Sequence, residues 1–242
     1  MWRIASATST GSVRDTNEDR ISICGRRTVE GPAIGLESKA PNQYVLIADG
    51  MGGHAKGEVA SHMALTKLEA LHRQLLTEDG VAVALRAANR AIYEAAMANG
   101  EFLGMGTTIV GVAIEQRRCR WFNVGDSRAY LSRDRNLTQI SKDHVPAVLA
   151  GGRRDHSITQ SLGGGRFFTE ILPSQGEFEV QEGDRILLCT DGLTDVVGDV
   201  EIERILGRDD PAPTLERLIA RCFELGAPDN ISLALMEFES AP

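Results

Sequence analysis

The clearest feature of the hydrophobic pattern is a short apolar run that stops on an acid and breaks into glycines. Residues 45–48 are apolar and lead into Asp49 and Gly50, which is typical of a buried strand ending in a turn. The runs 185–190 and 121–124 repeat this pattern and lead into Asp191 and Asp126. Glycine lets the backbone approach a small ligand closely. We therefore expect the three strand ends to converge on one site.

The rest of the chain alternates between strand-like runs and segments with helical spacing. Strands are predicted at 2–9, 20–24, 107–114, 118–124, 127–132, 136–140, 168–172, 177–180, 185–190 and 231–238. Amphipathic helices are predicted at 56–77, 80–98, 199–207 and 211–225, with Asp79 or Gly80 capping the second. Residues 25–42 are interpreted as a hairpin or surface loop, and 141–166 as an irregular flap with a short helix around 146–150.

Short connections between the strands indicate antiparallel hairpins, and the helices come in pairs. This grouping predicts an α+β fold, a four-layer α/β/β/α sandwich in which two antiparallel sheets pack face to face with helix pairs outside. The pattern contains no linker and no internal repeat, so we expect a single domain over residues 1–242.

Charge and cysteine content narrow the class of protein. The 242 residues carry a formal net charge of -8, which argues against nucleic acid or an anionic membrane as a partner. Four scattered cysteines without C-x-x-C spacing fit reduced thiols better than disulfides or zinc. The first residues lack the apolar core of a signal peptide, and no apolar run is long enough to span a bilayer. We therefore expect a cytoplasmic protein, and a monomer.

Acids gather at the ends of the predicted elements: Glu18, Asp19, Asp49, Asp126, Asp191 and Asp229. Carboxylates brought together in one cleft repel one another, and divalent cations relieve the repulsion. Ligation by oxygen alone selects Mg²⁺ or Mn²⁺, and two such ions can activate a water and clamp a phosphoryl group. Arg14 offers a two-pronged phosphate contact. Together these groups describe hydrolysis of a phosphate ester, although Asp-Gly turns and an Arg14 ion pair with an acid are the plainer interpretations.

Six motifs follow one another in order over nearly the whole chain. They are Arg14-x-x-Asn17-Glu18-Asp19, Asp49-Gly50-Met51-Gly52-Gly53-His54, Gly106-Thr107-Thr108, Gly125-Asp126-Ser127-Arg128, Asp191-Gly192-Leu193-x-Asp195 and Asp229-Asn230. In this the chain resembles the metal-dependent protein phosphatases of the protein phosphatase 2C family, bacterial stand-alone type. The resemblance implies a β-sandwich flanked by helices and a dinuclear Mn²⁺ or Mg²⁺ centre that acts on phosphoserine and phosphothreonine in proteins.

The resemblance also implies roles for individual residues. Asp49 would bridge the two metals, Asp191 and Asp229 would complete the shell of one ion, and Glu18 and the Gly50 carbonyl would hold the other. Asp19 would orient a metal-bound water, and Arg14 would bind the substrate phosphate. Asp126, with Asp191, would hold the third metal of bacterial-type members. His54 is a candidate general acid, although metal-bound water could supply the proton instead.

Three departures from the family pattern affect the surroundings of the site. Ser9 stands where many bacterial members carry Asp, Val145 stands where Ser is usual, and the segment after Asp143 is short. His144 and His156 lie in the flap region and could touch substrate. The expected partners are phosphoproteins, an opposing Ser/Thr kinase and, from chain length alone, type VI secretion. A catalytically silent scaffold of the same fold and a phosphatase for small molecules remain as alternatives.

Overall fold

The computed structural model describes residues 1–40, 42–52, 56–146, 157–207 and 209–239. Two six-stranded antiparallel sheets form its centre. The first has the order β11 (Asn136–Gln139), β10 (Arg128–Arg133), β14 (Arg185–Cys189), β15 (Ile231–Phe238), β1 (Trp2–Ser9) and β4 (Ile34–Ser38). The second has the order β13 (Ser174–Glu179), β9 (Arg118–Val124), β8 (Ile109–Glu115), β5 (Asn42–Ala48), β2 (Arg20–Ile23) and β3 (Arg26–Arg27).

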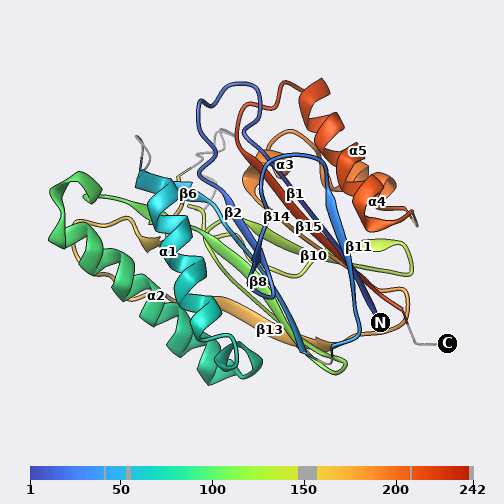
Figure 1. Cartoon of the computed structure of the whole chain (residues 1–242), viewed down its shortest axis with the longest axis horizontal. Coiled ribbons are helices and arrows are strands. Elements are labelled where there is room, and N and C mark those ends of the chain that lie inside the picture. The colour runs from blue at the N-terminus through green and yellow to red at the C-terminus, as the bar shows by residue number, and fades with distance from the viewer. Residues whose placement is uncertain (41, 53–55, 147–156, 208, 240–242) are drawn as a thin grey trace.

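Helices cover the outer face of each sheet (Figure 1). The long pair α1 (Lys56–Ala70) and α2 (Glu78–Ala98) lies on the second sheet. The helices α3 (Asp191–Thr194), α4 (Asp199–Leu206) and α5 (Pro211–Glu224) lie on the first. Short 3-10 turns, η1 (Gln74–Leu76) and η2 (Gly100–Phe102), flank α2.

Three separate apolar clusters hold the layers together. One cluster lies between the two sheets and includes Ile4 of β1, Ile47 of β5 and Leu188 of β14. The other two lie between each sheet and its helices, with Leu85 of α2 in one and Leu218 of α5 in the other. Because apolar side chains are buried on both faces of each sheet, central strands such as β5, β8, β14 and β15 are nearly continuous apolar runs. The four-layer prediction is confirmed.

Several predicted element boundaries need correction. Residues 25–42 contain β3 and β4, and β4 pairs with β1 at the edge of the first sheet rather than forming a hairpin that leads into β5. The first helix ends at Ala70. The cap of α2 is Thr77, whose hydroxyl accepts the Gly80 N–H at 3.2 Å, rather than Asp79 or Gly80. The short helix predicted around 146–150 falls largely outside the described residues.

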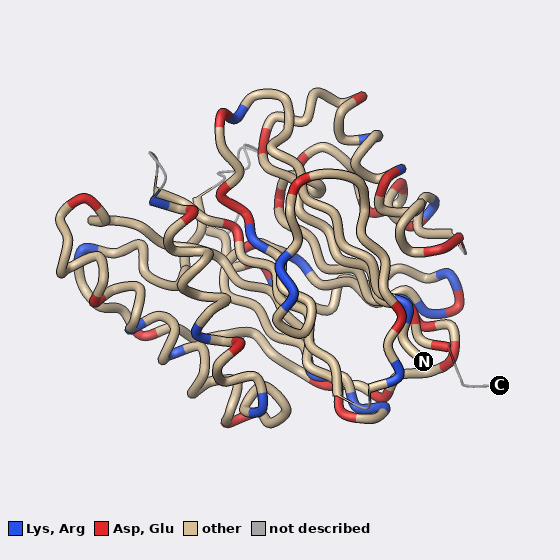
Figure 2. Tube along the Cα trace, viewed as in Figure 1, with Lys and Arg blue, Asp and Glu red and all other residues tan. Residues whose placement is uncertain are grey.

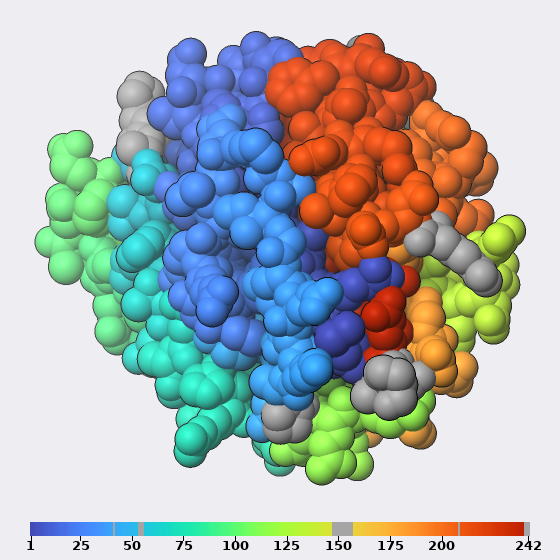
Figure 3. Space-filling view, turned by 45° about the vertical axis from the view of Figure 1, so that its right-hand side comes forward, coloured from blue at the N-terminus to red at the C-terminus, as the bar shows by residue number. Residues whose placement is uncertain are grey.

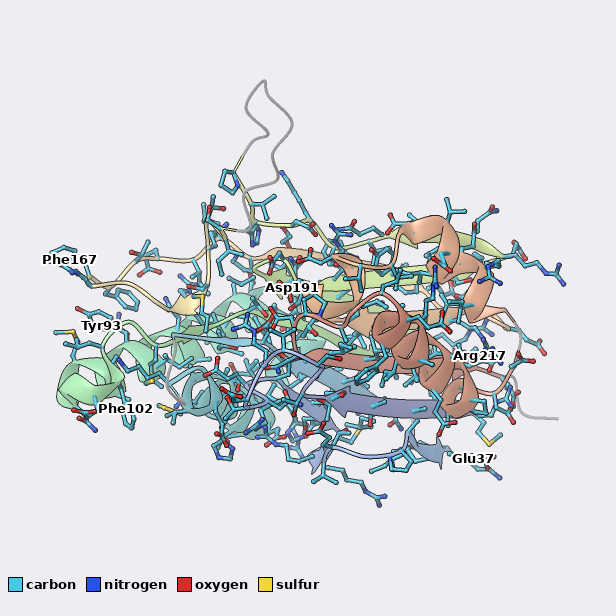
Figure 4. All side chains as sticks on the ribbon, turned by 90° about the horizontal axis from the view of Figure 1, so that it is seen from above. Glu37, Tyr93, Phe102, Phe167, Asp191 and Arg217 are labelled. Atoms are coloured by element: carbon cyan, nitrogen blue, oxygen red, sulfur yellow. The ribbon has the colours of Figure 1, made fainter. Side chains whose placement is uncertain are left out.

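The predicted strand at 168–172 is wrong. Side chains of α2 hold this segment, and it makes no backbone pairing with a neighbouring strand of the described ranges. The Asn89 amide donates to the Thr169 carbonyl at 2.9 Å. Phe168 stacks edge-on against Tyr93 with ring centroids 5.5 Å apart, and Arg90 lies over the Phe168 ring. Phe167 points away from α2 (Figure 4) and is 81% exposed.

A third, small sheet has three strands, in the order β12 (Leu162–Gly163), β7 (Gly106–Thr107) and β6 (Gly50–Met51). One of them, β6, directly follows β5 in the chain. Within the described ranges no helix is long and apolar enough to cross a membrane. Figure 2 shows basic and acidic residues interspersed along the described part of the trace, where no long stretch carries only positive charge.

Candidate metal centre

The strand ends that carry acids lie at one end of the two large sheets. Residue Ala48 of β5 pairs with Arg20 of β2, so Asp49 and Asp19 leave the second sheet side by side. In the first sheet, Cys189 of β14 pairs with Arg128 of β10 and with Leu233 of β15. Asp191, Asp126 and Asp229 therefore come from neighbouring strand ends. The antiparallel register, rather than sequence proximity, brings the acids together.

Four of these acids, Asp49, Asp126, Asp191 and Asp229, line one pocket of about 620 Å³. Its walls include seven carboxylates, Asp15, Glu18, Asp49, Asp126, Asp191, Asp195 and Asp229, together with Arg14 and Gly50. Asp191, at the first turn of α3, lies near the middle of the molecule in Figure 4. The structure thus brings together Arg14, Glu18, Asp49, Gly50, Asp126, Asp191 and Asp229, all of which the sequence nominated; their roles as ligands stay predictions.

The backbone of Asp49 is held by the strand that follows α2. Its carbonyl accepts the Thr108 N–H and the Thr107 hydroxyl, each at 2.8 Å. Its N–H donates to the Thr108 hydroxyl at 3.2 Å. Because Thr107 and Thr108 satisfy the backbone N–H and carbonyl of Asp49, its carboxylate is left to face the pocket.

Two glycines allow helices to touch the site loops. A Cβ on Gly50 would lie 2.1 Å from the carbonyl oxygen of Gly57 in α1, and a Cβ on Gly192 would lie 1.9 Å from the carbonyl oxygen of Asn230. Real Cβ atoms do not approach backbone this closely, so no larger residue fits at either position. The first turns of α1 and α3 therefore sit directly against Gly50 and Asn230.

Asn230 connects the loop that carries Arg14 to the start of β15. Its amide nitrogen donates to the carbonyls of Thr10 and Thr16 at 2.9 and 3.0 Å, and its oxygen accepts the Glu18 N–H at 2.9 Å. Asn230 is buried, and these three hydrogen bonds all reach the 10–18 loop. Asn230 therefore fixes the loop in place.

Burial and the charges of neighbouring carboxylates raise the pKa values of these acids. Burial is the largest cause for Asp49, followed by the charges of Asp19 and Asp191, and the pKa of Asp49 lies well above its usual value. The pKa of Asp191 is also raised well above its usual value, by burial and then by Asp126 and Asp229. Burial also raises the pKa of Asp126. This is the behaviour expected of acids that share one site without a cation.

Asp19 lies beneath this cluster and is only 2% exposed. Its Oδ2 accepts the Thr190 hydroxyl at 2.9 Å, whereas its Oδ1 is buried with no hydrogen-bond partner. Burial raises the pKa of Asp19 to about 7. A buried oxygen without a partner is rare in native proteins, and an ion or a water is a common explanation.

Arg14 contacts an acid of the site. Its Nη2 donates to Asp229 Oδ2 at 2.7 Å, and the Arg14 side chain is 54% exposed. The hydrogen bond to Asp229 raises the pKa of Arg14. The ion pair considered from the sequence is therefore present, and the exposed guanidinium stands at the pocket wall where a phosphate would enter.

The donor set fits a hard divalent cation. The acidic side chains that line the pocket offer only oxygen as a ligand atom. Among the described residues, the pocket lining contains none of the free cysteines, which are Cys24, Cys119, Cys189 and Cys222. No three His, Cys, Asp or Glu residues of the described ranges are grouped closely enough to hold an ion as they stand. An incoming cation would have to draw the carboxylates inward, and it would offset both the burial and the mutual repulsion that raise the pKa values of Asp49 and Asp191.

The other nominated residues have different outcomes. His54 and His156 lie outside the described residues. His144 is 8% exposed, and both ring nitrogens bond to protein atoms, so it is not available to substrate. Ser9 is not among the described residues of the pocket wall, and its hydroxyl accepts the Gly11 N–H. Val145 is 39% exposed.

Sequence reasoning gave no role to Asp195 or Asn230, although both stand in the quoted motifs. Asp195 lines the pocket one helical turn after Asp191, and its charge raises the pKa of Asp126 and Asp191. The i, i+4 spacing after Asp191 could have shown that both carboxylates share one helix face. Nothing in the sequence shows that Asn230 holds the 10–18 loop, because its partners are backbone groups of a distant segment.

Comparison with known proteins gives a consistent result. Residues 33–237 match the family model for protein phosphatase 2C. The chain is 35% identical to the serine/threonine protein phosphatase PstP of Mycobacterium tuberculosis over 97% of its own length, and it spans 45% of that relative. It is 32% identical to the serine/threonine phosphatase stp of Listeria monocytogenes over 95% of this chain and 93% of that one.

A solved structure supports the same relationship. The catalytic domain of PstP in complex with two manganese ions superposes with a TM-score of 0.81 at 31% identity, covering 99% of this chain and 100% of that one. The family model, both relatives and this structure agree with the ordered motifs and with the two-sheet fold. The chain belongs to the protein phosphatase 2C family.

Proposed function

We propose that this chain is a metal-dependent serine/threonine phosphoprotein phosphatase that hydrolyses phosphate monoesters with water. The observation that carries the proposal is the pocket in which seven carboxylates and Arg14 meet from segments far apart in the sequence. Supporting it, the relatives PstP and stp are named as serine/threonine phosphatases, and a PstP structure holds two manganese ions.

The proposed ligand roles are those that the resemblance implies, and all the residues concerned line the pocket. Asp49 would contact both of two Mn²⁺ or Mg²⁺ ions, Asp191 and Asp229 would hold one, and Glu18 with the Gly50 carbonyl would hold the other. Asp126 with Asp191 would hold a third ion. When bound, these ions supply Lewis acidity, which acidifies a water and offsets the charge on the phosphoryl group.

The chain's own groups prepare the reaction in two ways. Arg14 presents a planar, two-pronged donor at the pocket wall, and its release from Asp229 would free it to bind the phosphate oxygens. Asp19 lies under the acids with a pKa of about 7. Its Oδ1 has no hydrogen-bond partner, and it would orient the attacking water.

Several finer predictions remain part of the proposal. The substrates would be phosphoserine and phosphothreonine in proteins, and the enzyme would oppose a Ser/Thr kinase in signal transduction. A single domain, a monomeric state, a cytoplasmic location and the link to type VI secretion are kept as predictions. His54 remains the candidate general acid.

The decisive experiment measures phosphate release from a phosphothreonine peptide. Purified protein should require Mn²⁺ or Mg²⁺ and should lose activity with EDTA. Asp191→Ala should reduce turnover by at least about 100-fold, since it removes a ligand to the catalytic cations. Asp79→Ala, an exposed acid in the first turn of α2, is the matched control. Full activity of the Asp191 variant, or activity without a divalent cation, would contradict the proposal.

A further inference from the structure

His144 is a buried histidine to which the proposed reaction gives no role. Its Nδ1 accepts the Gly125 N–H at 3.1 Å, and its Nε2 lies 3.0 Å from the Ser174 hydroxyl. A backbone N–H can only donate, so Nδ1 carries no proton and the neutral ring has its proton on Nε2. Burial lowers the pKa of His144, in keeping with this neutral form.

The backbone of His144 adds two more contacts at the same place. Its N–H donates to the Gly125 carbonyl at 2.9 Å, so residues 144 and 125 are joined by a reciprocal pair of hydrogen bonds. Its carbonyl accepts the Thr159 N–H at 2.7 Å. Ile158, the residue before Thr159, lines the pocket. His144 therefore joins the turn before Asp126 to a segment of the pocket wall.

Gly125 is held from the opposite side as well. Its φ is +107°, and a Cβ there would lie 2.6 Å from Cγ2 of Thr108. Thr108 in turn donates its N–H to the Asp49 carbonyl. The turn that carries Asp126 is thus wedged between Thr108, which touches the Asp49 backbone, and the His144 ring. With φ in this region a small rotation of Gly125 would redirect the Asp126 carboxylate.

We propose that His144 is a positioning residue for Asp126: by accepting the Gly125 N–H, its Nδ1 holds the turn so that the Asp126 carboxylate faces Asp191 and can share a divalent cation with it. The inference rests on the proposed function, because it needs Asp126 to be a cation ligand. It assigns to a residue of the flap region a part in cation binding instead of a contact with substrate.

Two isosteric substitutions separate the contacts of the ring. Asn at position 144 can place its amide oxygen near the position of Nδ1, whereas Gln reaches the position of Nε2 and leaves the Gly125 N–H unpaired. Binding is measured by calorimetric titration of metal-free protein with MnCl₂. The cation that Asp126 would share with Asp191 is identified as the one whose binding is lost in Asp126→Ala. His144→Gln should weaken its binding by about 10- to 100-fold, the usual loss when a partner that orients a ligand is removed. His144→Asn should bind it nearly as well as the wild type.

Two further variants isolate the path of the effect. Ser174→Ala removes only the partner of Nε2 and should leave Mn²⁺ binding unchanged. His144→Gln combined with Asp126→Ala should match Asp126→Ala alone in Mn²⁺ binding and in turnover, because coupled residues are not additive. Thermal unfolding verifies that each variant is folded. If the Gln variant does not fold, His144→Ala also removes the acceptor and should show the same loss.

Each result decides the question. Equal losses in the Asn and Gln variants, wild-type binding in His144→Gln, or an additional loss in the double variant would overturn the inference while leaving the proposed function intact. Wild-type protein that binds no Mn²⁺, or Asp126→Ala that binds as many ions as the wild type with the same affinities, would instead count against the proposed metal ligands and would overturn this inference with them.

Discussion

Replacing Asp19 by asparagine should make the metal-free protein more stable. The carboxyl is 2% exposed, it lies next to Asp49, and its Oδ1 has no hydrogen-bond partner. Asparagine keeps an oxygen to accept the Thr190 hydroxyl and places an amide donor near the Asp49 carboxylate. The substitution therefore removes a buried charge without removing the shape that the site requires.

The size of the gain follows from the pKa. Burial raises the pKa of Asp19 from 3.8 to about 7 in the folded protein. Because the folded state binds the proton more tightly than the unfolded state, Asp19 lowers the free energy of unfolding as the pH rises from 3.8 towards 7. The full loss is present above pH 7. About three pKa units correspond to about 4 kcal/mol at pH 8, and to about 2 kcal/mol at pH 5.

The assay is urea unfolding in EDTA at both pH values. The free energy of unfolding of Asp19→Asn should exceed that of the wild type by an amount that roughly halves between pH 8 and pH 5. Asp15→Asn, an exposed acid of the same loop, should change stability little at either pH. A gap that does not depend on pH, or a less stable Asp19→Asn, would refute the argument from burial. The same variant should lose phosphatase activity, as expected where a functional group is held in an unfavourable environment.

Three other predictions concern packing, capping and phosphate recognition. Gly192→Ala, whose Cβ would lie 1.9 Å from the Asn230 carbonyl oxygen, should lower the free energy of unfolding by about 3 kcal/mol or more. Gly100→Ala is the control, because a Cβ there would have no atom within 4 Å, and it should not lower this free energy. Urea unfolding measures both variants, and equal effects would contradict the packing argument. Thr77→Ala should cost about 1 kcal/mol by removing the cap of α2, and Thr77→Ser should restore most of it in the same measurement. Arg14→Lys should lower kcat/KM for a phosphothreonine peptide by about 10- to 100-fold, since a single ammonium replaces a two-pronged contact; an unchanged kcat/KM would remove Arg14 from phosphate binding.

The sequence predicted most of the sheets and helices because apolar periodicity is strong where two layers meet. Strands such as β14, which is buried throughout, and β8, which is buried up to its last residue, can be recognised from their own composition. The failures fall where contacts with distant segments decide the structure. β4 is largely exposed and owes its place to pairing with β1, and the segment 168–172 has strand-like composition but is held by Asn89 and Tyr93.

The candidate site shows the same division. Acids at strand ends could be nominated from the sequence because a carboxylate followed by glycine ends a buried run, and the motifs gave their order. The contact between Arg14 and Asp229 was considered from the sequence only as an unspecified ion pair. The place of His144 under the Gly125 turn could not be predicted, because it depends on how the 141–146 segment returns to the end of β9.

The pairing of β1 with β15 has a consequence for the order in which the protein is built. Thr8 and Ser232, whose hydroxyls meet at 2.8 Å, are 224 positions apart, and β15 lies in the first sheet between β14 and β1. Figure 3 shows the early, blue part of the chain beside the late, orange-red helices α4 and α5. During synthesis β1 can pair with β4 early, but it must wait for β15 until nearly the whole chain has left the ribosome. The pocket, which needs Asp229 just before β15, would be completed among the last events, so an incomplete nascent chain would carry no working phosphatase site.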